Sequence, residues 1–252
     1  MHDQHRSRPR AYVSATTKPD INAQVELGIA WARGLGLGSV TVRVPMMNWL
    51  ETHGGEIELT SLDGANHTSR HGRPFPTGVI VDVCPTPDFL EMDDPATTAL
   101  CVVGLLPRDA PPAPDDRTLS ADDIWLAAFP DAIPLGDPVV SASLAIDPIA
   151  AVAFSSLASL VNASTGFGHD SDKASRDVTV LRLLEAQVPF NANDASVVLL
   201  RAGFPGRFIA DFHQRVNGLL RRSVRPHKRW QQRLRADIVE AVWRPEAERR
   251  FS

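Results

Sequence analysis

The stretch that decides the fold is residues 10–44, which read RAYVSATTKPDINAQVELGIAWARGLGLGSVTVRV. It opens with a short alternating segment and closes with a β-branched segment, VTVRV, and both patterns are typical of strands. Between them, apolar or small residues recur at helical spacing from Ile21 to Ala32, and the glycines of 34–38 predict the end of this helix. The order strand, helix, strand predicts two parallel strands joined by a crossover helix.

Further segments extend this pattern along the chain. Residues 56–62 alternate with period two, and residues 78–83 and 98–106 are continuous apolar runs of the kind that fills strands buried on both faces. Residues 124–129, IWLAAF, fit either a strand or a helical turn, and we expect a strand. The sequence therefore predicts an α/β domain over 10–138, with a mostly parallel sheet of five to six strands and crossover helices.

The later part of the chain has a helical pattern instead. Helices are expected at 177–187, 194–202 and 207–222, and the last of them has one apolar face. We expect a helical C-terminal part over 139–222. A basic tail, which could be flexible and which carries few apolar residues, is expected over 223–252.

Charge is distributed unevenly along the chain, although the net charge is only −4. Residues 201–252 hold 13 of the 26 lysines and arginines but only 5 of the 30 acidic residues, which gives this end a charge of +8 and residues 1–200 a charge of −12. Charge that is separated in this way indicates a basic arm for a polyanion, so DNA or RNA is an expected partner.

The basic end contains the residues that we expect to contact nucleic acid. The turn GFPG at 203–206, between two predicted helices, resembles a helix-turn-helix in its spacing, although a glycine turn between helices is common in helical proteins. Segment 221–235, RRSVRPHKRWQQRLR, has seven basic residues, no acids and one tryptophan that could stack on a base. The candidates are Arg207, Arg215, Asn217, Arg221, Arg222, Arg225, Lys228, Arg229, Trp230, Arg233 and Arg235.

The carboxyl edge of the sheet offers a second candidate site, because open parallel sheets bind ligands there. Asp82 near the end of a strand is the expected catalytic carboxylate, within a side chain's reach of Thr16 or Lys18. Thr16, Thr17, Lys18 and Asp88 are the expected ligand-binding residues, for a nucleotide-like or phosphorylated small molecule. Strand ends are polar in any case, and neither standard glycine-rich phosphate loop is present.

The connector NASTGFGHDSDK, residues 162–173, is a third candidate. Gly166 and Gly168 would let backbone N–H groups approach an anion at the start of the next helix. His169, oriented by Asp170 or Asp172, could act as a general base, so His169 and Asp172 are counted as catalytic candidates. The alternative is that these residues only form a turn and cap a helix.

The sequence says less about metals, cofactors and the cellular compartment. His67 and His71 have the spacing of zinc ligands on a helix, but glycines and prolines surround them, so no metal site is expected and no cofactor can be named. The cysteines, Cys84 and Cys101, lie in apolar runs and are expected to be free thiols. No apolar leader or spanning run occurs, so a cytoplasmic protein without a membrane partner is expected.

Two hypotheses about function remain. In the first, the chain is a nucleic-acid-associated binding or regulatory module whose basic helical end contacts DNA or RNA. In the alternative, it is a small α/β enzyme that acts on a nucleotide-like or phosphorylated substrate at the carboxyl edge of its sheet. The first is favoured because the charge asymmetry can be counted and no catalytic motif is present.

Overall fold

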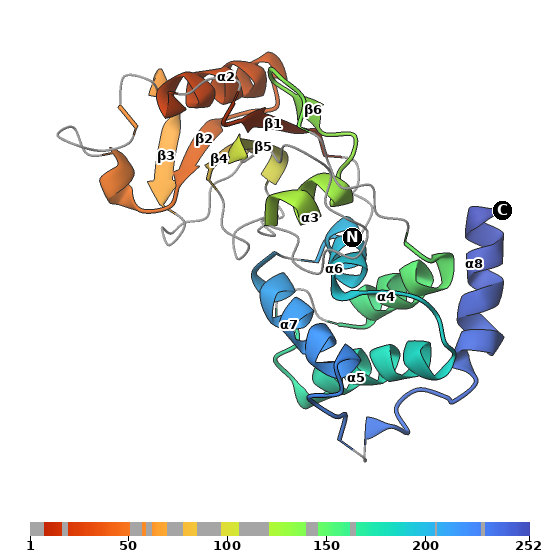
Figure 1. Cartoon of the computed structure of the whole chain (residues 1–252). Helices are drawn as coiled ribbons and strands as arrows, with labels where there is room; N and C mark the ends of the chain where they lie inside the picture. Colours follow the sequence, from red (N-terminus) through yellow and green to blue (C-terminus); the bar gives the residue numbers. More distant parts are fainter. Residues whose placement is uncertain are drawn as a thin grey trace.

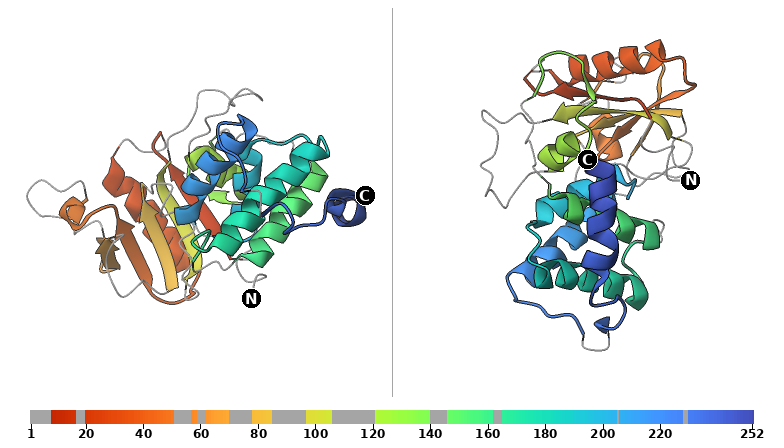
Figure 2. Two further views of the ribbon diagram at one scale, coloured as in Figure 1. Left: turned by 90° about the horizontal axis from the view of Figure 1, so that it is seen from below. Right: turned by 90° about the vertical axis from the view of Figure 1, so that its right-hand side faces the viewer.

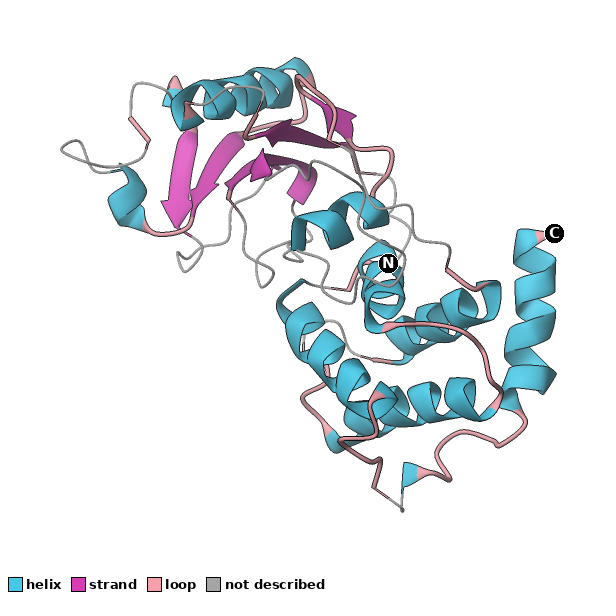
Figure 3. Ribbon diagram, in the orientation of Figure 1, coloured by secondary structure: helices cyan, strands magenta, loops and turns pink. Residues whose placement is uncertain are grey.

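A computed structural model of the chain describes residues 8–16, 20–50, 57–58, 62–69, 78–84, 97–105, 121–139, 146–161, 165–204, 206–227 and 230–252. A sheet with its covering helices forms one end of the molecule, and a group of helices forms the other (Figures 1 and 3). The predicted fold class, an α/β sheet followed by a helical C-terminal part, is confirmed.

The sheet of the described residues has six strands, all parallel, in the order β3-β2-β4-β5-β1-β6. The strands are β1 (Arg10–Ser14), β2 (Val40–Val44), β3 (Asn66–Ser69), β4 (Gly78–Val83), β5 (Thr97–Leu105) and β6 (Ile133–Pro134). Because β5 and β4 lie between β1 and β2, the connecting helix α2 (Ile21–Gly34) crosses the middle of the sheet. All carboxyl ends therefore lie at one edge.

Different helices cover the two faces of the sheet (Figure 2, right). α2 packs closely on one face, where a Cβ at Gly28 would lie only 2.9 Å from a methyl group of Val81. α3 (Ala121–Ala128) covers the other face, on which its buried Trp125 packs in one apolar cluster with Ile80 and Val102. The continuous apolar runs of the central strands follow from this burial on both faces.

One expected strand is wrong, and a second is not a strand at the few positions of it that the structure describes. Residues 124–129 belong largely to helix α3, whose Trp125 and Leu126 pack on the sheet while Ile124 and Ala127 pack on the helical part. A helix that is apolar on both sides has the same continuous apolar run as a buried strand. In the predicted strand 56–62, the described residues Ile57 and Leu62 are buried but not in a strand.

The third strand lies instead in a segment that the sequence indicates to be a polar loop. β3 has the sequence NHTS, and it pairs with β2 at the edge of the sheet. Its side chains are exposed or half-buried, so the strand carries no apolar alternation. An edge strand that is exposed in this way gives a sequence pattern little different from that of a loop.

The helical part is built around one central helix. Its elements are α4 (Pro148–Leu160), α5 (Asp170–Glu185), α6 (Ala192–Arg201), the 3₁₀ turn η4 (Gly206–Phe208), α7 (Ile209–Leu220), the π-helical turn η6 (Val239–Trp243) and α8 (Arg244–Phe251). Residues 192–200 of α6 are all buried. Asn191 begins α6 with a capping box, in which its side chain accepts from the Asp194 N–H and its own N–H donates to the Asp194 carboxylate.

The end of the chain is packed rather than detached, in contrast to the tail expected over 223–252. Val239, Trp243 and Ala247 are buried in the same apolar cluster as α4 and α6. These few apolar residues recur at four-residue spacing, so they form one stripe on η6 and α8. Removing residues 221–252 would therefore uncover part of the core.

The sheet and the helical part meet at α3 and α6. Arg201, at the end of α6, donates through Nε and Nη2 to the carbonyl oxygens of Ala128 and Ala127. These carbonyls belong to the last turn of α3, where helical hydrogen bonds are missing. The guanidinium therefore caps α3 and ties the two parts of the molecule together.

Candidate nucleic-acid interface and ligand sites

At the carboxyl edge of the sheet, Asp82 forms an ion pair with Arg43. Arg43 lies directly opposite Asp82 on the neighbouring strand, and donates through Nε to Oδ1 at 3.0 Å and through Nη2 to Oδ2 at 2.6 Å. Asp82 is fully buried, and Arg43 is 5 % exposed. Both side chains lie on the face opposite α2. Such a bidentate, buried pair offers no exposed carboxylate oxygen.

The other residues expected at this edge do not join Asp82. Thr16 is exposed, and its hydroxyl lies 2.8 Å from Ser14 Oγ. Because β5 lies between β4 and β1, Asp82 and Thr16 are separated by two strand spacings, about 10 Å. Thr17, Lys18 and Asp88 lie outside the described residues.

Neither cysteine forms a disulfide, and Cys101 on β5 is fully buried whereas Cys84 is half-buried. Burial, and secondarily the charge of Asp82, raise the pKa of the Cys101 thiol far above its usual range. A thiol in this state is not a nucleophile, so Cys101 is a packing residue. His67 is exposed on β3, and His71 lies outside the described residues. No group of three metal-ligating side chains occurs in the described part of the chain.

The connector before α5 forms a turn whose glycines have structural roles. Gly166 has a φ of +55°, and a Cβ there would lie 2.5 Å from the ring of Phe208. The N–H of Gly168 donates to the carbonyl oxygen of Thr165 at 3.2 Å, so it is not free for an anion. His169 is exposed at the N-cap of α5 and its side chain makes no cap hydrogen bond, whereas Asp172 accepts from the Ser171 hydroxyl. No contact between the side chains of His169 and Asp172 is present.

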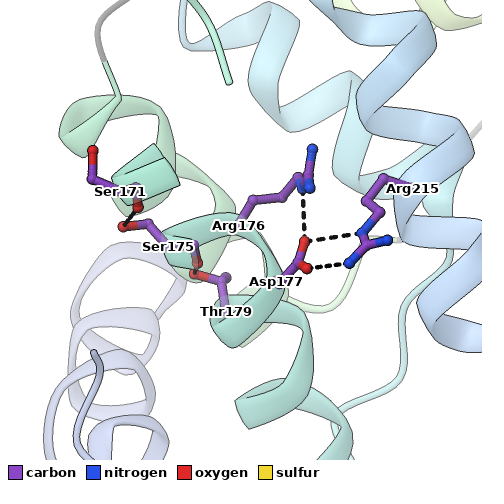
Figure 4. A network of polar contacts seen from close by, with 6 residues as sticks. All are labelled: Ser171, Ser175, Arg176, Asp177, Thr179 and Arg215. Atoms are coloured by element: carbon purple, nitrogen blue, oxygen red, sulfur yellow. Dashed lines mark hydrogen bonds and ion pairs between the residues drawn. The ribbon is translucent and has the colours of Figure 1, made fainter. Parts of the chain in front are cut away.

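A network of charged residues lies between α5 and α7 (Figure 4). The fully buried carboxylate of Asp177 accepts from Arg176 Nε at 2.9 Å and from Arg215 Nε and Nη2 at 3.2 and 2.5 Å. Burial lowers the pKa of Arg176, an effect that the adjacent Asp177 opposes and Arg215 adds to. Two guanidinium groups therefore share one carboxylate.

A cavity of about 500 Å³ opens beside this network. Lys173, Arg176 and Arg215 line it, together with the single acid Asp211. Its apolar wall consists of Phe167, Phe208 and Val224. This combination of cationic and aromatic side chains is suited to a ligand with an anionic group and an apolar part.

The remaining arginines of the basic end form two groups. In the first group, each arginine makes an ion pair with an acidic residue two to four positions away in the sequence. This group consists of Arg235, Arg244, Arg249 and Arg250. The arginines of the second group are exposed and form no ion pair with any residue that the structure describes. This group consists of Arg221, Arg222, Arg225 and Arg233. The side chain of Arg207, and Lys228 and Arg229, lie outside the described part.

The segment that carries these unpaired arginines is held in place. The buried Arg182 of α5 donates through Nη2 to the carbonyl oxygens of Gln231 and Leu234 at 2.6 and 3.1 Å. The N–H groups of Ser223 and Val224 donate to the carbonyl oxygen of Gly218 at the end of α7. The segment lies at the end of the molecule farthest from the sheet (Figures 1 and 2).

Trp230, the candidate for base stacking, lies in the same segment. Its side chain is half-buried, and its ring centroid lies 5.9 Å from that of the exposed His227. One part of the indole therefore remains accessible beside the unpaired arginines.

Several polar residues of α7 make contacts within the protein. His213 Nε2 lies 2.8 Å from Asn193 Oδ1 of α6, and Asn217 Nδ2 lies 3.3 Å from His213 Nδ1. Arg215 is bound to Asp177 of α5. Arg215 and Asn217, the residues of α7 that we expected to contact nucleic acid, are thus engaged within the protein, whereas Gln214 of the same helix is exposed.

The largest of the cavities described, about 780 Å³, lies where the sheet meets the helical part. Arg8, Arg10, Arg201 and Arg250 line it, with Asp131 as the acidic residue. Burial and the neighbouring Arg8 lower the pKa of Arg10 to about 9, and its guanidinium lies 3.7 Å from the ring centroid of Phe129. The sequence carries no signal for this cavity because its arginines come from three separate segments, around residues 8–10, at 201 and at 250.

Among the described residues, no helix is long and apolar enough to cross a membrane. No curated protein and no solved structure matches the chain. Residues 146–243 match the model of a family described as a domain of unknown function (DUF1889). The match runs from just before α4 to the last residue of η6, so the helical part, with the Asp177 network and the unpaired arginines, is the region that resembles this family.

Proposed function

We propose that the chain binds nucleic acid, and that segment 221–235 makes the contacts through phosphate groups. The observation that carries the proposal is the group of four exposed arginines, Arg221, Arg222, Arg225 and Arg233, without an ion pair in the described part of the chain. An arginine without a carboxylate partner can neutralise a phosphate and release its counterion. The arginines of α8 are less suited to this, because each already makes an ion pair with a glutamate, Arg244 with Glu240 and both Arg249 and Arg250 with Glu246.

Hydrogen bonds to the backbone of the segment, at positions 223, 224, 231 and 234, support the same proposal. Hydrogen bonds from Arg182 and to Gly218 hold its backbone, so less conformational entropy is lost when a strand binds. Trp230 adds a ring on which a base can stack. Arginines on a held loop therefore form a surface along which a phosphate backbone can run.

We propose binding with little sequence preference. His213, Arg215 and Asn217 on α7 are engaged with Asn193, Asp177 and one another, so they are not available for base edges. Phosphate contacts position a nucleic acid but do not read its sequence. The alternative of an enzyme at the carboxyl edge has less support, because the Asp82 carboxylate is buried and bound to Arg43.

The test is fluorescence anisotropy with labelled single-stranded and duplex DNA and RNA, using the full chain at low salt. The variant combines Arg221→Gln, Arg222→Gly, Arg225→Gln and Arg233→Gln. Glycine suits position 222, because Arg222 has a φ of +55° at the end of α7. We expect the variant to bind at least about a hundredfold more weakly, because each lost phosphate contact removes a counterion-release gain.

The matched control removes the same charge from the ion-paired arginines, by glutamine substitution of Arg235, Arg244, Arg249 and Arg250. We expect its affinity for nucleic acid to stay within about threefold of that of the unmodified chain, since only the long-range electrostatic attraction is reduced. Absence of binding by the unmodified chain at micromolar concentration would refute the proposal. Equal losses in the two variants would do so as well, because the effect would then come from net charge alone.

A further inference from the structure

The Asp177 network holds more positive charge than its one carboxylate can neutralise. Arg215 binds Asp177 through two nitrogens, and this pair is balanced. Arg176 adds a second guanidinium that uses only Nε for Asp177. The Nη atoms of Arg176 make no hydrogen bond with any residue in the described part of the chain, and Figure 4 shows one of them pointing away from Asp177.

Arg176 is only 8 % exposed as a whole residue. Its Nη atoms are not among the buried side-chain atoms that lack a hydrogen-bond partner, so what is exposed of the residue includes these nitrogens, and they reach the water of the cavity that Arg176 lines. Burial of the side chain lowers the pKa of Arg176, because burial opposes the charged form. An anion that enters the cavity can accept the hydrogen bonds that these nitrogens otherwise give to water.

The side chains around the cavity decide which anion fits. Lys173 is half-exposed at its mouth, where its Nζ lies 3.7 Å from Asp170, a distance too long for a strong ion pair. Asp211 is exposed and forms no ion pair closer than 4 Å with a described residue. The wall of the cavity therefore carries three cationic groups and one acid, and the carboxylate of Asp177 lies behind Arg176 and Arg215.

We propose that this cavity binds a phosphate monoester, with the phosphate on Arg176, Arg215 and Lys173 and the organic part against Phe167, Phe208 and Val224. A phosphate has enough acceptor oxygens to use all three cations at once, and guanidinium groups match it in geometry. The volume of about 500 Å³ is large enough for a nucleoside monophosphate.

Two kinds of ligand carry a phosphate monoester, namely a free mononucleotide and a nucleic-acid strand with a 5′-terminal phosphate. The second source would connect the cavity with the interface proposed above, since Val224 belongs to segment 221–235. The site itself does not depend on that interface, because its first probe is inorganic phosphate.

The experiment measures thermal unfolding of the full chain in phosphate and in chloride at equal ionic strength. With a dissociation constant of about 1 mM, about 10 mM phosphate should raise the Tm by about 3–5 °C, since a ligand that binds only the folded state stabilises it. Arg176→Gln should abolish this rise. Lys173→Gln, at a half-exposed position where folding is not at risk, should reduce phosphate affinity severalfold.

Arg244→Gln is the control, because Arg244 is paired with Glu240 and lies outside both the cavity wall and segment 221–235, and it should keep the full rise. No rise in the unmodified chain, or an equal rise in Arg176→Gln, would overturn the proposal. If Arg176→Gln does not fold, Lys173→Gln decides, and an unchanged affinity in that variant is the overturning result.

Two further probes separate the sources. Tighter binding of adenosine monophosphate than of inorganic phosphate, lost in Lys173→Gln, indicates a free mononucleotide. Tighter binding of a 5′-phosphorylated oligonucleotide than of its 5′-hydroxyl counterpart, again lost in Lys173→Gln, indicates a strand end. If the arginine variants of segment 221–235 lose oligonucleotide binding but keep the phosphate-dependent rise in Tm, the interface and the cavity are separate sites.

Discussion

The sheet and the helical part each bury an aspartate that binds arginine, and the second of these clusters borders a cavity. In the sheet, Arg43 donates to both carboxylate oxygens of Asp82, and this carboxylate is fully buried. In the helical part, Asp177 binds Arg176 and Arg215, and both arginines line the cavity. A buried carboxylate that is bound to arginine is closed to a ligand, whereas cationic groups on the wall of a cavity are open to one. The comparison therefore assigns a structural role to the first site and a binding role to the second.

The largest effect is expected from Asp177→Asn, which leaves two buried or half-buried guanidinium groups facing each other. Removing one partner of a buried ion pair costs about 3–5 kcal/mol of unfolding free energy. Urea denaturation measures this loss. If the cavity binds anions, phosphate should restore part of the lost stability of this variant. If the unfolding free energy of Asp177→Asn is the same in phosphate and in chloride, Asp177 has a purely structural role, as Asp82 does.

The sheet pair should respond in a different way. Asp82→Asn alone should also cost about 3–5 kcal/mol, because Arg43 would remain buried without its partner. The double variant Arg43→Met, Asp82→Leu should recover most of this loss, because a balanced pair can be replaced by apolar side chains of similar volume. Denaturation with and without phosphate should give the same values for both variants. Phosphate-dependent stability of Asp82→Asn would show that the sheet site also binds anions.

A smaller effect is expected from pH at His213, one of the polar residues of α7 that make contacts within the protein. Burial lowers the pKa of His213, so the unfolded chain takes up a proton at a higher pH than the folded chain does. The free energy of unfolding should therefore fall as the pH decreases below about 6.5, the ordinary value for histidine. His213→Gln should lose this part of the pH dependence. An unchanged profile would mean that His213 can be protonated in the folded state and is not locked between Asn193 and Asn217.

Much of the fold follows from local pattern, and the exceptions have physical reasons. The buried strands β1, β2, β4 and β5 show apolar runs because helices cover both faces of the sheet. β3 is an exposed edge strand and α3 is apolar on two sides, so neither shows the hydrophobic periodicity that is typical of its secondary structure. Periodicity reports burial, and only indirectly the secondary structure that produces it.

The candidate sites could be predicted only in part. Segment 221–235 is visible as a run of basic residues, but the sequence does not show which arginines have partners. The cavity was partly indicated by the connector 162–173, because Gly168 and Lys173 line it. Arg176 was missed, because its importance depends on sharing Asp177 with Arg215, which lies on a different helix. Contacts of this kind depend on tertiary packing and leave no local pattern.

The salt dependence of duplex binding tests the central claim most directly, because its slope counts the phosphate contacts. If four arginines each meet one phosphate, the slope of log K against log salt concentration should be about −3.6. In the variant of Arg221, Arg222, Arg225 and Arg233 the slope should approach zero, while the control in the ion-paired arginines keeps it. A slope that the first variant leaves unchanged would contradict the account, because the phosphates would then be bound elsewhere on the molecule.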